Sequence, residues 1–319
     1  MKDALANVYS KIEGFSRLAI LATIAIFLTL RIFGLQLNLS AQIAIALIGL
    51  VIGIPHGAID HLISIPAHPR SRFALYIAAY VAIAIASGAM IAIWNLRGFQ
   101  AVLIMSSLHF GYGDAAYRNE WRGIEGREKF PVAIETLYAI PAGFIPVILP
   151  LTDPKSGDAL HRIRTTLESW AGSESSLLRT LTLSVGAISI ALLLATNSFQ
   201  FAIDLTLLAA LALIAPPLVA FATYFGFWHA ARHTARLVPK LPRARSLAAQ
   251  GACWGAIRAA IMPGLYAVVG SALVASGLML FDRRHFSSSL LWSALVLIWA
   301  LTVPHMISTS RFDLRALRK

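Results

Sequence analysis

Histidine is the residue type best able to do chemistry in this chain, which contains nine histidines and one cysteine, Cys253. One thiol can form neither an intramolecular disulfide nor a cysteine-based zinc or iron–sulfur site. A bound metal would therefore be held by histidine and carboxylate side chains. Clustered imidazoles suit a transition ion such as iron, zinc or copper better than magnesium or calcium, which prefer oxygen ligands.

The strongest local pattern is WHAARH, which places His229 and His233 four residues apart. Helical residues at this spacing lie one turn apart on the same face. Both imidazoles can then reach one ion. The pair predicts a metal site, and hydrogen bonding between helices is the alternative use of each histidine.

A second pattern, IPHGAIDH, combines a histidine with a carboxylate. His56 and Asp60 are expected to share a helix face, whereas His61 points away from that face. A metal-bound imidazole usually donates its other N–H to a carboxylate or a carbonyl, which fixes the tautomer. Asp60 is therefore the predicted partner of His56. Pro55 also frees the carbonyl of Val51, which offers another acceptor.

Two further histidines lie in apolar stretches, where an unpaired ionisable group is costly and a functional role is the default expectation. LHFGYGD places His109 close to Asp114, between which two glycines permit close approach of a ligand or a neighbouring helix. VPHMI places His305 after a proline. Its role stays open between metal ligand, support for a ligand and contact with substrate. The remaining histidines are expected in or near loops or helix ends, with no assigned role: His61, His68, His161 and His285.

The elements that position these histidines are expected to be membrane-spanning helices. Hydrophobic residues make up 58% of the chain and charged residues 13%, and the mean hydropathy is +0.71. In lipid the backbone must satisfy its own hydrogen bonds, and continuous apolar runs without alternation favour helices over barrel strands. The fold class is therefore all-α, a polytopic transmembrane bundle forming one membrane domain over 1–319. The charge-free runs are 18–30, 32–59, 73–96, 180–203, 205–231, 259–281 and 286–310, with shorter ones at 98–113 and 136–152.

The net charge of +12 is interpreted as membrane topology rather than nucleic-acid binding, because basic residues lie in short loops between apolar runs. The predicted loop 232–250 contains five basic residues and no acidic residue, which places it in the cytoplasm. With a cytoplasmic N-terminus, the segment 203–236 then crosses twice and breaks at Pro216-Pro217. This gives about ten spans, with eight or nine as alternatives.

Two longer loops are predicted at 115–130 and 153–175, and the second is expected to form a short amphipathic interfacial helix. The chain starts with a long polar segment, and no small-residue cleavage site follows the first apolar run, so no processing is expected. Aromatic residues beside the histidines are expected to line a tunnel for a conjugated hydrocarbon, with lipid contact as the alternative. They are Phe110, Tyr112, Tyr224 and Trp228.

IPHGAIDH, HFGYGD, WHAARH and TVPHM, in this order through a multi-span chain, resemble the bacterial Brp/Blh family of β-carotene cleaving oxygenases. The resemblance covers roughly residues 50 to 310. It implies a multi-pass enzyme of the inner (cytoplasmic) membrane that uses non-haem Fe(II) and O2 to cut β-carotene at its central double bond, giving two retinal molecules. Membrane lipid would surround the enzyme, and a rhodopsin is a candidate acceptor of the retinal.

Carried over residue by residue, the resemblance implies that four histidines bind the iron: His56, His109, His229 and His233. Asp60, Asp114 and His305 also fall on motif positions, and the two aspartates are the candidates to support the ligands. Two other function classes stay open. One is a membrane di-iron desaturase or hydroxylase, whose family pattern needs about eight histidines. The other is a non-enzymatic carotenoid-binding or transport protein.

Overall fold

A computed structural model describes residues 1–64, 69–281 and 286–317, and these residues form helices joined by short turns. The first half contains α1 (Lys2–Ile32), α2 (Leu39–Gly57), α3 (Asp60–Ser64), α4 (Arg70–Ile93), α5 (Asn95–Ile124), α6 (Val132–Leu151) and α7 (Ser156–Ile163). The second half contains α8 (Ser175–Ala195), α9 (Phe199–Ile214), α10 (Pro217–Thr223), a π-helical turn (Tyr224–His229), α11 (Ala230–Leu237), α12 (Pro242–Ala249), α13 (Cys253–Ile261), α14 (Leu265–Phe281) and α15 (Phe286–Leu317).

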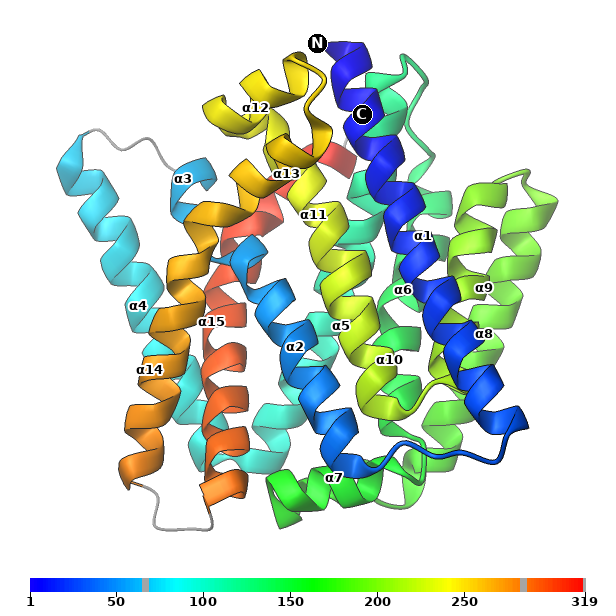
Figure 1. Cartoon of the computed structure of the whole chain (residues 1–319), viewed down its shortest axis with the longest axis vertical. Coiled ribbons are helices and arrows are strands. Elements are labelled where there is room, and N and C mark those ends of the chain that lie inside the picture. The colour runs from blue at the N-terminus through cyan, green and yellow to red at the C-terminus, as the bar shows by residue number, and fades with distance from the viewer. Residues whose placement is uncertain (65–68, 282–285, 318–319) are drawn as a thin grey trace.

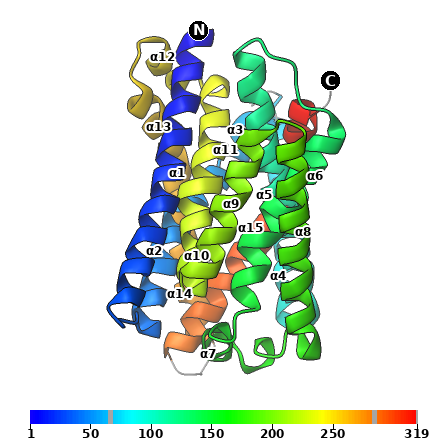
Figure 2. The ribbon, with the colours of Figure 1, turned by 90° about the vertical axis from the view of Figure 1, so that its right-hand side faces the viewer.

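The long helices run along one axis of the molecule, as expected for a transmembrane bundle (Figures 1 and 2). Seven helical segments in the described ranges are long and apolar enough to cross a membrane: Lys2–Ile32, Leu39–Leu62, Arg70–Ile93, Val132–Leu151, Gly172–Ala195, Cys253–Val274 and Leu295–Leu317. The predicted all-α membrane fold is confirmed. The count of ten spans stays a prediction, because the apolar helix α9 is shorter than these segments and α5 carries several charged residues.

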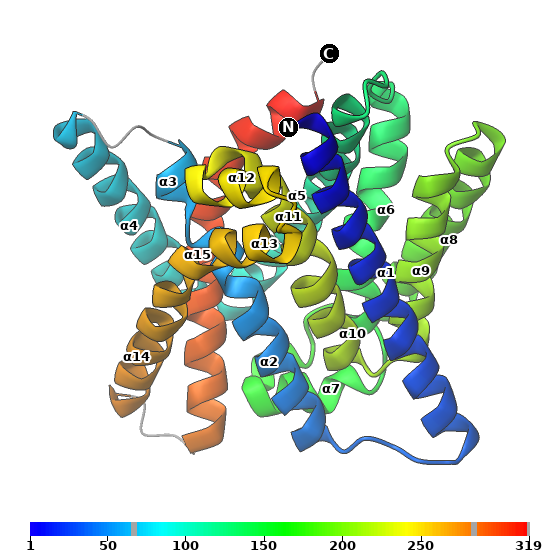
Figure 3. The ribbon, with the colours of Figure 1, turned by 45° about the horizontal axis from the view of Figure 1, so that its top comes forward.

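The break at Pro216-Pro217 is confirmed, because α9 ends at Ile214 and α10 begins at Pro217. Ala215 is extended, with φ −79° and ψ 151°, since a residue that precedes proline is pushed out of the helical region. The two helices run in opposite directions along the bundle (Figures 1 and 2). The predicted interfacial helix is also present as α7, which lies at the end of the bundle opposite α12 and α13 (Figures 1 and 3).

The loops predicted at 115–130 and 232–250 are wrong over most of their length. Helix α5 continues to Ile124, and the segment 232–250 contains the end of α11 and the whole of α12. Arg232 and Arg236 are fully buried. Arg236 pairs with Glu120 at 3.0 Å and with Asp313 at 2.6 Å. These carboxylates belong to α5 and α15, so counting acidic residues within the loop could not find them.

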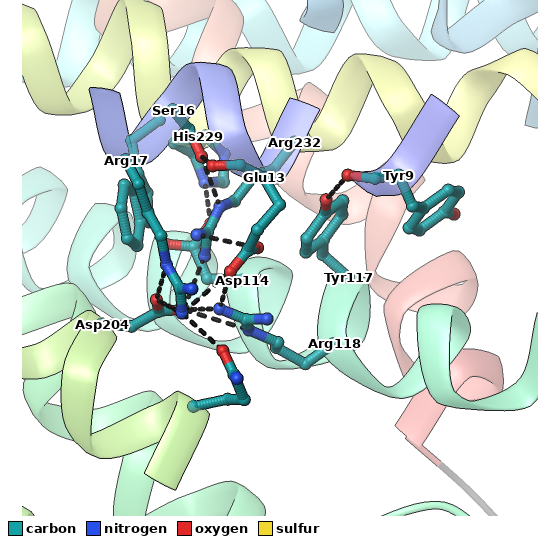
Figure 4. Close-up of polar contacts among 12 residues, drawn as sticks. Tyr9, Glu13, Ser16, Arg17, Asp114, Tyr117, Arg118, Asp204, His229 and Arg232 are labelled. Carbon is teal, nitrogen blue, oxygen red and sulfur yellow. Dashed lines mark hydrogen bonds and ion pairs between the residues drawn. The ribbon is translucent and has the colours of Figure 1, made fainter. Parts of the chain in front are cut away.

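A buried network of charges joins four helices (Figure 4). Asp204 of α9 receives hydrogen bonds from Arg17 of α1 and Arg118 of α5. Arg232 of α11 donates to Asp204 at 2.9 Å and to Glu13 of α1 at 3.3 Å. Each of these ions is costly to bury alone, but together they neutralise most of the charge and fix the relative positions of their helices.

Small residues let the helices approach closely. At the crossing of α5 and α6, a Cβ added to Gly111 would overlap the backbone of Ala139, and one added to Gly143 would overlap the backbone of Ser107. Transmembrane helices use such small-residue contacts because backbone packing, rather than the hydrophobic effect, drives their association in lipid. The crossing holds α5, and with it His109, against the rest of the bundle.

Candidate metal centre

Five imidazole rings from four parts of the bundle converge in its interior. His56 lies in the last turn of α2, His109 within α5, His229 and His233 on the π turn and α11, and His305 within α15. The ring centres of His56 lie 5.5 Å from His229, 5.1 Å from His233 and 5.4 Å from His305. Those of His109 lie 5.3 Å from His229 and 5.0 Å from His305. The structure therefore brings together all five histidines that the sequence places in apolar stretches.

Several imidazole nitrogens in this histidine cluster are buried without a hydrogen-bond partner in the part of the chain that the structure describes. They are Nε2 of His109, His229 and His305 and both ring nitrogens of His233. A buried polar atom left unpaired costs free energy, and such atoms call for an explanation such as a bound ion or water. The unpaired nitrogens of neighbouring rings are the donor set that a transition ion requires.

The donor chemistry fits a metal, but the side chains do not form a ready-made ligand shell. No group of three or more histidine, cysteine, aspartate or glutamate side chains among the described residues is arranged to hold an ion as it stands. Imidazoles that share one ion at nitrogen distances of about 2 Å hold their ring centres about 5 to 6 Å apart. Neighbouring rings of the cluster lie 5.0 to 6.2 Å apart, which is close to this range.

Asp114 holds one side of the cluster. Its carboxylate accepts hydrogen bonds from Tyr224 Oη at 3.2 Å, Trp228 Nε1 at 3.0 Å and His229 Nδ1 at 3.3 Å. The π turn makes this possible, because its wider turn presents Tyr224, Trp228 and His229 to the same carboxylate. Such π turns often occur at functional sites. With Nδ1 bound to Asp114, the Nε2 atom of His229 is left free to face the cluster.

Asp60 holds the opposite side, through a partner that the sequence does not predict. It accepts hydrogen bonds from His305 Nδ1 at 2.9 Å and from Tyr80 Oη at 3.4 Å. The expected pairing of Asp60 with His56 is wrong, because α2 ends at Gly57 and Asp60 begins a separate helix, so the four-residue helical spacing does not apply.

His56 instead uses the backbone of its own helix. Its Nδ1 atom contacts the carbonyl oxygen of Gly53, which therefore takes the role foreseen for the carbonyl of Val51. The ring also packs edge-on against Phe225, with ring centres 5.8 Å apart. The tautomer of His56 is thus set by a carbonyl, and that of His229 by a carboxylate, both of which are common supports for metal-binding imidazoles.

A cavity of about 210 Å³ adjoins the cluster, between α2, α4, α5, α14 and α15. His56, His109 and His305 line it on one side, and Phe110 and Phe225 contribute aromatic faces. The cavity walls are mostly apolar, as a hydrocarbon ligand requires. His61 also lines the cavity, from α3, but its ring stands apart from the cluster beside Phe73.

Of the four aromatic residues expected beside a substrate, the structure brings Phe110 to the cavity. Tyr224 and Trp228 are fully buried and bind Asp114 instead, and Tyr112 packs against the apolar core. Sequence spacing does not show which way these rings point, because the π turn changes the helical period. The sequence gives no signal for Tyr80, which is twenty residues from its partner Asp60.

His161, for which no role is expected, is exposed on α7 and is not part of the cluster. It pairs with Glu168 at 2.7 Å. His68 and His285 lie outside the described residues.

Comparisons with known proteins agree with the motifs. The family described as beta-carotene 15,15'-dioxygenase matches residues 47–313, a range that contains the five clustered histidines. A beta-carotene 15,15'-dioxygenase from an uncultured marine bacterium, 66A03, is 29% identical over 274 residues, which cover 83% of this chain and 90% of that protein. No solved structure matches the chain. Because the family match spans most of the sequence, the chain belongs to the beta-carotene 15,15'-dioxygenase family.

Proposed function

We propose that this chain splits β-carotene at its central double bond with O2 and releases two retinal molecules. The observation that carries the proposal is the cluster of buried imidazoles with unpaired nitrogens beside an apolar cavity, in a chain of this family. The reaction balances without a reductant, because the central C=C bond breaks and each carbon takes one atom of O2 as its aldehyde oxygen.

Fe(II) is the proposed cofactor, and it would supply a redox-capable centre that binds O2 next to the polyene. Four imidazoles from three parts of the bundle would hold it through nitrogen: His56, His109, His229 and His233. Asp114 orients His229 by accepting the N–H of Nδ1.

The chain's own residues do the remaining work of binding and orientation. The cavity presents Phe110 and Phe225 to a conjugated chain beside the cluster. Its apolar lining selects a hydrocarbon over a polar substrate. Access from the membrane is the natural route, because the substrate dissolves in lipid and seven segments of the described chain can cross the bilayer. We place the protein in the inner (cytoplasmic) membrane, with a rhodopsin as a candidate acceptor of retinal.

Expression in bacteria that make β-carotene tests the proposal directly. Cells with the wild-type chain should lose their orange colour and accumulate retinal, and purified protein should contain one iron per chain. His229→Ala should abolish both effects, whereas His161→Ala, a matched removal of an exposed histidine, should change neither. A well-folded, iron-loaded protein in cells that stay orange would refute the cleavage of β-carotene. Two irons per chain would favour a di-iron desaturase or hydroxylase instead.

A further inference from the structure

His305 occupies a position in the cluster that matches that of His229. In each case Nδ1 donates to a buried carboxylate, at 2.9 Å to Asp60 for His305 and at 3.3 Å to Asp114 for His229. In each case Nε2 is buried and has no partner among the described residues. A carboxylate on one nitrogen and a free second nitrogen is the usual arrangement of a metal-binding imidazole.

A glycine lies against each of these two rings. A Cβ on Gly57 would stand 3.2 Å from Nδ1 of His305, and a Cβ on Gly113 would stand 3.1 Å from Cε1 of His229. Both distances are tighter than ordinary van der Waals contact, so a side chain at either glycine would press on the imidazole. The glycine thus lets each ring sit at its depth in the cluster.

His305 does not act as a support for another histidine. A supporting residue would hydrogen-bond the imidazole of a ligand, but the bonds of His305 Nδ1 go to Asp60, and its Nε2 is free. Its ring centre lies 5.0 Å from His109, 5.4 Å from His56 and 5.8 Å from His233. They are similar to the spacings between neighbouring rings of the four histidines proposed to hold the metal, which range from 5.1 to 6.2 Å.

We propose that His305 is a fifth histidine ligand of the metal, oriented by Asp60. This inference rests on the proposed function, since it requires that the cluster hold iron. The five imidazoles would then all hold the ion through nitrogen, with His229 and His305 each held by a carboxylate. The competing role, in which His305 only touches the substrate in the cavity, predicts that its removal leaves metal binding unchanged.

Anaerobic titration of the purified, metal-free protein with Fe(II) distinguishes the two roles. His305→Ala should weaken Fe(II) binding by at least as much as the loss of a supporting group, about 10–100-fold. X-ray absorption of the Fe(II)-loaded protein should count one fewer imidazole nitrogen around the ion than in the wild type. Asp60→Asn should weaken binding less than His305→Ala does and keep the nitrogen count. His161→Ala provides the matched histidine control and should bind Fe(II) as the wild type does.

Chemical rescue guards against a variant that merely fails to fold. His305→Gly with added imidazole should regain Fe(II) affinity, because the adjoining cavity can admit the free ring.

If His229→Ala loses Fe(II) while His305→Ala keeps wild-type affinity and nitrogen count, His305 is not a ligand and only this inference fails. If the wild-type protein binds no Fe(II) at all, the proposed function fails with it. If His305→Ala does not fold, absence of imidazole rescue together with unchanged Fe(II) binding in Asp60→Asn would overturn the inference.

Discussion

At the scale of single residues, Asp114 joins three side chains around the histidine cluster. Its carboxylate accepts one hydrogen bond from His229 and two from aromatic side chains that hold it in place. Because both oxygens accept, an amide cannot replace the carboxylate without turning an N–H toward another donor. The orientation of His229 therefore depends on the charge and shape of this one group.

Asp114→Asn should weaken Fe(II) binding by about 10–100-fold, as the loss of a supporting carboxylate typically does. The amide lacks the negative charge with which the carboxylate holds the N–H of His229. Asp158→Asn, an exposed aspartate on α7, is the matched control and should bind Fe(II) normally. Equal Fe(II) affinities in the two variants, measured by anaerobic titration, would show that Asp114 does not act on the metal through His229.

Gly113→Ala should lower Fe(II) affinity several-fold, because the added methyl group would lie 3.1 Å from Cε1 of His229 and must displace the ring. Gly123→Ala provides a control on the same helix, since a Cβ there meets nothing within 4 Å. That control should leave the affinity unchanged and stabilise α5 by up to about 1 kcal/mol. Loss of Fe(II) affinity in both variants would point to a general effect on α5 instead of a contact with His229.

At the scale of elements, buried ion pairs fix α11, which carries His233 and directly follows His229. Arg232 and Arg236 lie on α11 beside these histidines and bind carboxylates of α1, α5, α9 and α15. The guanidinium of Arg232 also stacks on Trp228, 3.5 Å from the ring centre, and so reaches the residues around Asp114. The arginines thus hold the position and rotation of α11.

Asp204→Ala should destabilise the protein by about 3–5 kcal/mol, the usual cost of leaving a buried partner unpaired. Three arginines would then surround Glu13 alone, and their excess charge would be buried. Glu125→Ala breaks an exposed pair with Arg127 and should cost at most about 1 kcal/mol. Unfolding by SDS in mixed micelles measures both changes. A stability loss for Asp204→Ala no greater than for Glu125→Ala would contradict a structural role for the network.

The sequence predicts the clustered histidines better than it predicts the side chains that hydrogen-bond to them. His229 and His233 are four residues apart in a continuous helical segment, so that they lie near each other follows from their spacing. The pairing of Asp60 with His305 could not be predicted, because it depends on where α2 ends and joins residues 245 positions apart. Charge counting failed at Arg232 and Arg236 for the same reason, since their partners come from distant helices.

At the scale of the whole molecule, the two ends of the bundle differ. The N-terminus, α12 and α13 lie at one end, and α7 lies at the other (Figures 1 and 3). With Arg232 and Arg236 buried, the positive charge next to α12 still includes exposed Lys240, Arg243 and Arg245. The tendency of basic residues to stay inside therefore still predicts that this end faces the cytoplasm.

Single-cysteine labelling should assign opposite sides to the two ends. Cys253 is buried and can be replaced by alanine, after which Ser246→Cys on α12 and Ser173→Cys before α8 each introduce one exposed thiol. In intact spheroplasts, a membrane-impermeant maleimide should label Ser173→Cys and should label Ser246→Cys only after lysis. Labelling of both thiols from outside would contradict the topology, and the reverse pattern would invert it.

The π turn at Tyr224–His229 also has a consequence for insertions and deletions in the chain. It joins α10, which packs closely on α2 where Gly49 meets Ala222, to α11, which the buried arginines fix. Removing one residue from the turn would let the helix close with an ordinary α-helical period, but it would rotate one half against the other by about 100°. Either the contact of α10 with α2 or the ion pairs of α11 would then have to break. The number of residues in this turn is therefore fixed by the attachments of the helices on either side of it.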